Sequence, residues 1–310
     1  MIKRTDKIKF NLNSLNLTDN QWRRLVVVGI PSVWLFCFLL LPFLFTLKMS
    51  VAESILASPP YTPLVTLSGN AIHILIELNN YIFVLAHGSI FLAFLSSVKI
   101  AFFTTIMCVL IGYPLAYAIA NSSPKVQSVL FLMVILPYWT SFLLRAYAWI
   151  ILLQNNGVVN QLLQALGITH MPIRMIYNDF SVYIGLLYGY LPFFVLPLYA
   201  TLIKLDRDVL EAAYDLGCPP WRAFLKITLP LSWSGVIAGA LLVFIPCVGE
   251  VVVPQILGGV NTLMIGNVIW QEFFIGNNWG VAAALAIIML ILLVVPVVWL
   301  QRLQQKRALS

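Results

Sequence analysis

The chain has 310 residues, of which 61% are hydrophobic and only 9% are charged, and its formal net charge is +7. This composition is typical of an integral membrane protein and argues against nucleic-acid binding, even though basic residues are in excess.

Apolar segments long enough to cross a bilayer occur six times along the chain. A helix needs about 20 apolar residues to cross a hydrocarbon core of roughly 30 Å. The candidate spans are residues 25–47, 94–120, 128–153, 180–203, 231–256 and 280–300. The predicted fold class is therefore an all-α membrane protein with six transmembrane helices. A polar N-terminal segment, 1–24, precedes a single six-span domain, 25–310.

The distribution of basic residues predicts the orientation of the spans, because Lys and Arg favour the cytoplasmic side. With a cytoplasmic N-terminus, fourteen Lys and Arg residues face inside and two face outside. The two on the outside are Lys48 and Arg174. We therefore expect both termini to be cytoplasmic, together with the loop 204–230, while residues 48–93 form an external loop with a helical stretch at 71–87.

The loop 204–230 is a polar interruption with the residue pattern of a helix–turn–helix. Asp208 is suited to cap a first helix, and Glu211 three residues later completes an acidic form of the capping box. Gly217 supplies the left-handed residue that ends this helix.

A second helix is predicted directly after that turn. Pro219 and Pro220 suit its first turn, residues 221–228 form its body, and Pro230 is expected to stop it. Two well-specified short helices in one loop favour a docking element over an ordinary connector.

The sequence of this loop resembles the EAA coupling loop of ABC importer permeases. The matching residues, with Asp215 included in the same coupling set, are Glu211, Ala212, Ala213, Gly217, Ile227, Leu229 and Pro230. Further segments resemble permeases of polyamine ABC importers, and the match is nearest to the putrescine-system permease type that carries a glutamate at position 250. They are IGYPLAYAIA (111–120), LPYWTSFLLRAYAW (136–149), LPFFVLPLY (191–199), VGEVVVPQILGG (248–259) and MIGNVIWQEFF (264–274).

The resemblance implies a type I importer in the inner membrane of a bacterium. Two homologous six-span permeases would pair with two cytoplasmic ABC ATPases, and an external binding protein would deliver the polyamine. No cofactor is expected in this chain. ATP and Mg²⁺ would bind the partner ATPase, since the sequence has no phosphate-binding loop of its own. The chain itself is not expected to be an enzyme.

Glu250 is the most conspicuous ionisable residue within a span, where burying a charge costs about 2.5–3.5 kcal/mol. Pro246, Gly249 and Pro254 surround it and predict a kinked or locally opened helix that leaves backbone carbonyls near the carboxylate. Such a site would handle a cation. The alternatives are a structural glutamate, paired for instance with Arg145, or a residue close to the external interface.

Three aromatic residues are candidates for a substrate path beside Glu250. Aromatic faces attract organic cations, with up to about 2 kcal/mol per contact when both are desolvated. On this basis Tyr147, Tyr190 and Trp139 are path candidates, although aromatic residues in membrane helices more often serve packing. No residue pattern predicts a metal site, and the four cysteines are too widely spaced for a disulfide framework.

Other functions fit parts of the sequence. An ion-gradient secondary transporter could use Glu250 as its proton or sodium carboxylate, but the coupling loop would then have no purpose. A membrane scaffold or biosynthetic enzyme is a second rival. Within the ABC class, the substrate could instead be an amino acid, ferric iron or an anion.

Overall fold

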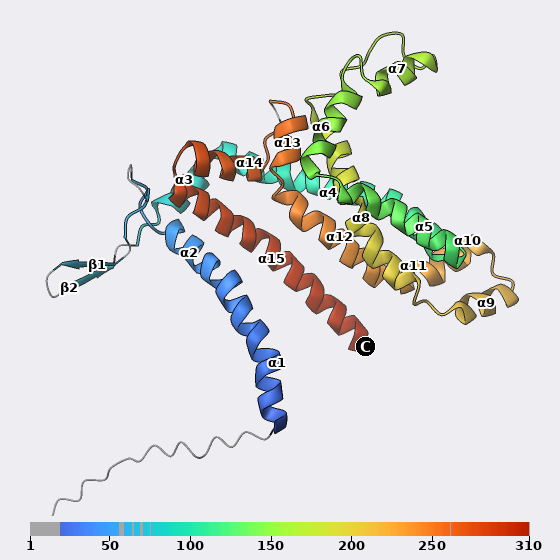
Figure 1. The fold of residues 1–310 in the computed structure, drawn as a ribbon, viewed down its shortest axis with the longest axis horizontal. Coiled ribbons are helices and arrows are strands. Elements are labelled where there is room, and N and C mark those ends of the chain that lie inside the picture. Colours follow the sequence, from blue (N-terminus) through green and yellow to red (C-terminus); the bar gives the residue numbers. More distant parts are fainter. Residues whose placement is uncertain are drawn as a thin grey trace, which may run out of the picture.

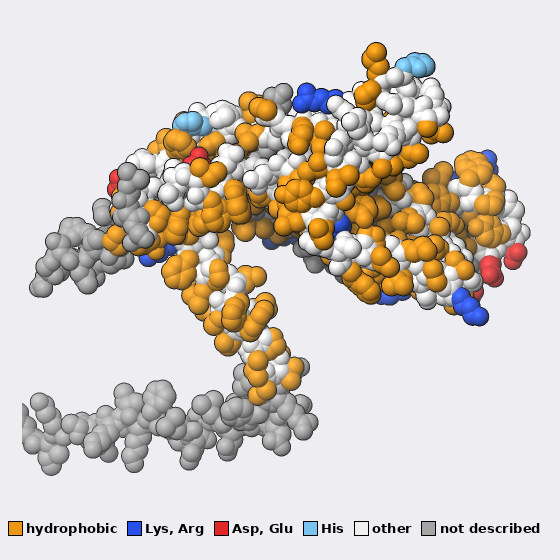
Figure 2. Space-filling view, turned by 45° about the horizontal axis from the view of Figure 1, so that its top comes forward, with side chains coloured by type: hydrophobic (Ala, Val, Ile, Leu, Met, Phe, Trp, Pro, Cys, Tyr) orange, Lys and Arg blue, Asp and Glu red, His pale blue; other side chains and the backbone are white. Residues whose placement is uncertain are grey.

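The computed structural model describes residues 19–55, 59–63, 65–68, 71–74, 76–260 and 262–309. Most of the predicted N-terminal segment 1–24 thus lies outside the described residues. Long helices run side by side through the body of the molecule, and the first helix leaves this bundle at its N-terminal end (Figure 1). Hydrophobic side chains cover most of the visible helix surface, as expected for helices in lipid (Figure 2).

The six predicted spans correspond to four single helical segments and two bent pairs of helices. The single segments are Val26–Ser50, Gly88–Ala120, Asp179–Leu202 and Trp279–Val298. The first comprises most of α1 (Asp19–Leu35), the π-helical turn η2 (Phe36–Leu40) and α2 (Leu41–Ser50); the others are α4 (Gly88–Ala120), α8 (Asp179–Leu202) and most of α15 (Trp279–Leu309). The all-α membrane fold is confirmed.

The third span differs from the continuous helix predicted over 128–153. Its first arm is α5 (Pro124–Ile135) with the 3-10 turn η3 (Leu136–Trp139), and its second arm is α6 (Phe142–Leu153) and α7 (Val158–Ala165). The two arms meet at 93°. At the corner the backbone of Thr140 is extended, and the Thr140 hydroxyl donates to the Pro137 carbonyl oxygen at 2.7 Å. Pro137 lacks the N–H of a regular helix, and polar residues follow it, so the chain turns there.

The fifth span is also a bent pair, and its bend lies beyond Pro230. α10 (Pro220–Ala223), the π-helical turn η4 (Phe224–Thr228) and α11 (Leu229–Leu231) form one arm, and α12 (Trp233–Val248) forms the other, at 64°. The prediction that Pro230 stops the helix is therefore wrong. Proline is tolerated in the first turn of a helix, and Pro230 occupies that position in α11, after a π turn in which the Leu229 N–H bonds to the Phe224 carbonyl.

The packed core lies among α4, α8 and α12. Phe194 in α8 is fully buried there, together with Val243 and Cys247 of α12. A side chain at Gly239 would meet the Phe194 carbonyl oxygen at 2.8 Å, so only glycine lets α8 and α12 approach this closely. Close backbone contact of this kind stabilises helix pairs in lipid, where no hydrophobic force drives them together.

The region 48–93, predicted to be external, holds less helix than expected. Residues 71–74 form strand β2 (Ala71–Ile74), which pairs antiparallel with β1 (Val65–Ser68), and helix α3 begins only at Asn79 and ends at Ala86. The helical prediction for 71–87 is thus wrong for its first part, where β-branched residues favour a strand. The buried Asn80 side chain fixes α3 to the end of the first span, because its amide donates to the carbonyl oxygens of Ser50 and Ala52 at 3.1 and 2.8 Å.

Candidate functional sites

The loop 204–230 contains the predicted first helix, α9 (Arg207–Asp215), but its cap differs from the expectation. The Asp206 carboxylate accepts the Asp208 N–H at 3.0 Å and caps the helix. Asp208 lies in the first turn, where its charge favours the positive end of the helix dipole. The predicted capping box of Asp208 with Glu211 is therefore wrong, because the helix begins one residue before Asp208.

The turn after α9 agrees with the prediction. Gly217 has φ +77°. Its N–H donates to the Tyr214 carbonyl at 2.8 Å, and the Cys218 N–H donates to the Ala213 carbonyl at 3.0 Å. This pair of hydrogen bonds is the Schellman motif, which needs a left-handed residue at the glycine position.

Most of the predicted coupling residues lie on the surface. Glu211, Ala212, Asp215, Gly217 and Pro230 are exposed, Ile227 and Leu229 are half-buried, and Ala213 is buried. Ala213 therefore serves packing within the loop itself.

The loop also presents large apolar side chains that the motif does not include. Leu216 at the tip is 89% exposed and Trp221 is 60% exposed. In Figure 2, acidic side chains lie at this end of the molecule, beside apolar ones. A patch of apolar and acidic residues at a helix pair suits contact with another protein.

Three aromatic side chains join this loop to the bundle, and we call them the aromatic joint. Phe224 of η4 packs edge-to-face against Tyr113 and Tyr117 of α4, with ring centroids 5.5 Å apart in both pairs. The Tyr113 hydroxyl also shares a hydrogen bond of 2.8 Å with the hydroxyl of Ser232, the residue at the bend before α12. The loop is thus in contact with α4 directly and, through Tyr113, with the residue that precedes α12.

The predicted break around Glu250 is present. α12 ends at Val248, and a short helix, α13 (Val252–Leu257), follows. One Glu250 oxygen accepts the N–H groups of Val252 and Val253 at 3.0 and 3.4 Å, and the other accepts the Tyr190 hydroxyl at 2.5 Å. The groups around the carboxylate are thus donors rather than the expected carbonyls, because the break exposes the start of α13 to it.

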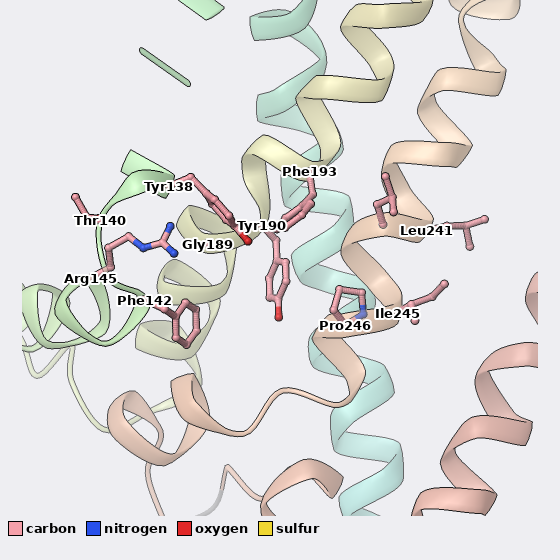
Figure 3. A pocket seen from close by; sticks show the side chains of 11 residues that line it. Tyr138, Thr140, Phe142, Arg145, Gly189, Tyr190, Phe193, Leu241, Ile245 and Pro246 are labelled. Atoms are coloured by element: carbon pink, nitrogen blue, oxygen red, sulfur yellow. The ribbon is translucent and has the colours of Figure 1, made fainter. Parts of the chain in front are cut away.

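A pocket of about 660 Å³ lies beside Tyr190, between the corner of the third span, α8 and α12 (Figure 3). Its lining is mainly apolar and aromatic: Tyr138, Thr140, Phe142, Arg145, Gly189, Tyr190, Phe193, Leu241, Leu242, Ile245 and Pro246. The Arg145 guanidinium carbon lies 4.9 Å from the Tyr138 ring centroid and 5.6 Å from that of Phe142. Glu250 is not part of the lining and reaches the pocket through Tyr190.

The structure brings together two of the four predicted path residues, Tyr190 and Glu250. Trp139 and Tyr147 are 75% and 55% exposed and do not line the pocket. The expected alternative partner of Glu250, Arg145, makes no contact with it; the Nε and Nη1 atoms of Arg145 are buried without a hydrogen-bond partner in the described part of the chain.

The lining residues Tyr138, Phe142 and Phe193 were not among the four predicted path residues. Their signal was present, since all three belong to the aromatic segments 136–149 and 191–199. Which aromatic side chains face the pocket depends on the 93° corner between the two arms of the third span.

Neither a metal cluster nor a disulfide is found in the ranges that the structure describes. No three His, Cys, Asp or Glu side chains gather there, and the four cysteines, all within these ranges, are free.

The sequence profile of binding-protein-dependent transport system inner membrane components matches residues 109–310. The chain belongs to this family. Residues 109–310 include the aromatic joint, the pocket and the coupling loop, so these features lie in the part shared with the family. Members are membrane components of transport systems, and the prediction that the chain is a permease rather than an enzyme is confirmed.

Curated relatives are similar over most of the chain. The spermidine/putrescine transport system permease protein PotB of Haemophilus influenzae is 37% identical over 276 residues, which cover 88% of this chain and 91% of the relative. PotB of Escherichia coli is 40% identical over 199 residues, covering 64% of this chain and 72% of the relative. The resemblance to polyamine permeases noted from the motifs is thus confirmed at the level of the whole sequence.

The fold matches a chain of a solved importer. A crystal structure of a bacterial alginate ABC transporter, in complex with alginate pentasaccharide-bound periplasmic protein, contains a chain that aligns with a TM-score of 0.68 and 16% identity. The alignment covers 90% of this chain and 93% of that one. At this identity the match establishes the ABC permease fold and not the substrate.

Proposed function

We propose that this chain is one of two permeases of an ATP-driven importer, and that its pocket forms part of the path of a polyamine such as putrescine. The observation that carries the proposal is the 37% identity to PotB of Haemophilus influenzae over 88% of the chain. Both termini and the loop 204–230 face the cytoplasm, and an external binding protein delivers the substrate.

The substrate path is supported by the chemistry of the pocket. Polyamines carry ammonium groups on an alkyl chain, so they need aromatic faces, apolar walls and a negative charge. Tyr138, Phe142 and Phe193 supply the rings, and the Glu250 carboxylate lies directly behind Tyr190. The Tyr190 hydroxyl donates to this carboxylate, and its oxygen stays available to accept a hydrogen bond from an ammonium group in the pocket.

The coupling to ATP is supported by the geometry of the loop. The exposed side of α9 and the apolar tip at Leu216 and Trp221 form the surface on which a cytoplasmic ABC ATPase docks. ATP and Mg²⁺ bind that ATPase, and its closure moves the loop. Through the aromatic joint this movement reaches α4 and α12, and α12 carries the pocket residues Leu241 and Ile245.

Transport by the purified complex tests the proposal. This chain, its partner permease, the ATPase and the binding protein are reconstituted in vesicles, and uptake of labelled putrescine and spermidine is measured with and without ATP. We expect uptake that requires ATP and the binding protein and that persists after ionophores dissipate all ion gradients. Competition with unlabelled amino acids, ferric iron and anions defines the substrate class.

Two outcomes would overturn it. Uptake by this chain alone, driven by an ion gradient, would establish a secondary transporter. If the complex takes up a different solute in an ATP-dependent way, and putrescine and spermidine do not compete, the chain is still an importer permease but the proposed polyamine substrate is refuted.

A further inference from the structure

Arg145 carries a charge at a place where the chain offers it no counter-ion. It belongs to α6 and its guanidinium points into the pocket between Tyr138 and Phe142 (Figure 3). Its Nε and Nη1 atoms are buried, and within the described ranges no hydrogen-bond acceptor reaches them. The two rings stabilise the cation, but they do not accept hydrogen bonds from Nε and Nη1, and buried donors of a charged group without a partner are unfavourable.

The depth of Arg145 excludes pairing with lipid phosphates. Gly189 and Tyr190 line the pocket beside it and lie near the middle of the 24-residue helix α8. At a rise of about 1.5 Å per residue, they are about 15–20 Å from either end of that helix. Arg145 lies in the first turn of α6, but this turn is at the corner of the third span and beside the middle of α8, so its side chain does not reach lipid phosphates and an acceptor would come from within the membrane.

The chain's own acidic residues do not supply that acceptor. Glu250 is the acidic residue nearest in depth, and both of its oxygens are engaged by Tyr190 and by the amides at the start of α13. Asp179 is the first residue of α8, and it accepts the Thr262 hydroxyl at 2.6 Å. No other Asp or Glu of the sequence falls within the membrane-spanning segments.

The pocket is open on one side, and large apolar side chains surround its mouth. Of the lining residues, Leu242 and Ile245 of α12 are 49% and 36% exposed. An apolar rim around an unpaired and partly desolvated cation fits the centre of a protein interface and not a lipid-facing surface.

We propose that the second permease places an aspartate or glutamate of one of its membrane helices against this mouth, and that this carboxylate pairs with Arg145. The inference rests on the proposed function, because it requires a second permease. According to this proposal, the open side of the pocket lies in the interface between the two permeases, because the charge of Arg145 requires an opposite charge there.

The ion pair would also decide what the path accepts. In the isolated chain the pocket presents the Arg145 charge, while the Glu250 charge is screened behind Tyr190. A polyamine is repelled by such a surface. A carboxylate from the second permease neutralises the guanidinium, after which the aromatic faces and Glu250 favour an ammonium group.

Copurification of the two permeases from membranes tests the pairing. Tagged variants Arg145→Lys, Arg145→Gln and Arg145→Glu are compared with the wild type, and Arg174→Glu, at an exposed position of the external loop, is the matched control for the change in net charge. Loss of a buried ion pair lowers affinity strongly, so we expect Arg145→Glu to recover at least about tenfold less of the second permease. Arg145→Gln is intermediate, while Arg145→Lys and Arg174→Glu pair normally.

A cross-link in the otherwise unchanged chain gives an independent measurement. A photoreactive phenylalanine in place of Leu242 is expected to cross-link to a membrane segment of the second permease that contains Asp or Glu. The same group in place of Phe91 of α4 is the control position. Exchanging that acidic residue for arginine restores assembly of Arg145→Glu, which a simple folding defect would not allow.

The outcomes separate this inference from the proposed function. If the wild-type chain recovers no second permease, the proposed function fails. If the wild type recovers it and Arg145→Glu recovers as much, the ion pair alone is refuted. A Leu242 cross-link to lipid only, with assembly intact, refutes the interface.

Discussion

The coupling loop and the pocket are built in opposite ways. The loop 204–230 is held by short-range bonds: its cap, its Schellman turn and its π turn each join residues at most five positions apart. The pocket joins residues from three separate parts of the chain, the corner of the third span, α8 and α12. The loop can therefore move as a unit, whereas the shape of the pocket changes whenever these helices shift against one another.

One helix connects these two regions. α12 begins at the bend beside the aromatic joint, carries Leu241, Ile245 and Pro246 of the pocket wall, and ends directly before Glu250. A rigid element that is moved at one end and lines the path at the other is a physical basis for coupling. Substitutions in the loop should thus change the coupling to ATP hydrolysis and leave the pocket intact. Substitutions in the pocket should change uptake of the substrate and leave the docking surface intact.

The largest effect is expected at Gly217. Valine at φ +77° is strained and would redirect the loop. We expect Gly217→Val to lower ATP-driven uptake at least about tenfold while the chain remains inserted, since the fold of the loop is needed for docking. Gly167 offers a matched control, because its φ is +70°, nothing lies within 4 Å of its side-chain position, and it follows helix α7, outside the loop 204–230. If Gly167→Val is equally inactive, backbone strain and not docking explains the loss.

The next effect concerns the pocket. Glu250→Gln keeps the size of the side chain and removes its charge, so an ammonium group loses the attraction that a carboxylate exerts at low dielectric. We expect the initial rate of polyamine uptake to fall several-fold or more, with normal docking of the binding protein. Glu272→Gln, in the π turn η5 (Gln271–Ile275), is the control. If Glu250→Gln takes up polyamine at the wild-type rate, Glu250 has only a structural role, as the cap of α13.

A smaller effect is expected at the aromatic joint. Phe224→Leu removes two edge-to-face contacts, each with about 0.5–1.5 kcal/mol. Because the loop is then less firmly joined to α4, we expect more ATP to be hydrolysed per polyamine transported. Leu225→Ala, at the neighbouring exposed position, should keep the wild-type ratio. An unchanged ratio in Phe224→Leu would show that the movement reaches the bundle by another route.

The smallest effect is expected from the hydrogen bond between Tyr113 and Ser232. Tyr113→Phe removes one hydrogen bond, for which about 1 kcal/mol is typical. An energy of about 1 kcal/mol corresponds to a factor of about five, so uptake should fall by no more than about fivefold. We expect the double variant Tyr113→Phe, Ser232→Ala to lose less uptake than the sum of the losses in the two single variants, because both substitutions remove the same hydrogen bond. Strict additivity would contradict the shared bond.

The same contrast explains what the sequence could predict. Gly217 and the helical pair follow from local residue preferences, and the break at Glu250 follows from Pro246, Gly249 and Pro254, which act on their own backbone. The apolar spans follow from length alone. Within the loop, two local details were wrong. The cap is Asp206 and not Asp208, because both are competent and one residue separates them, and Pro230 does not stop the helix, because it lies in the first turn of α11.

The pocket could not be predicted in the same way. The corner at Thr140 depends on packing as well as on Pro137, and it decides that Tyr138 and Phe142 face inward while Trp139 and Tyr147 face outward. The bond between Tyr190 and Glu250 joins residues 60 positions apart. Long-range contacts of this kind leave no periodic signal along a single sequence.

The π turn η4 has a consequence for the direction in which the loop faces. A π turn accommodates one residue more than an α-helical turn, and successive residues of a helix are rotated by about 100°. Removing one residue from Phe224–Thr228 would therefore rotate Trp221 and the whole of α9 around the axis by roughly that angle, while the cap of α9 and the Schellman turn at Gly217 stay unchanged. The number of residues in this turn thus sets the direction in which the docking surface faces around the helix axis. An insertion or deletion here would misalign this surface with the ATPase proposed to dock on it more than any single side-chain replacement.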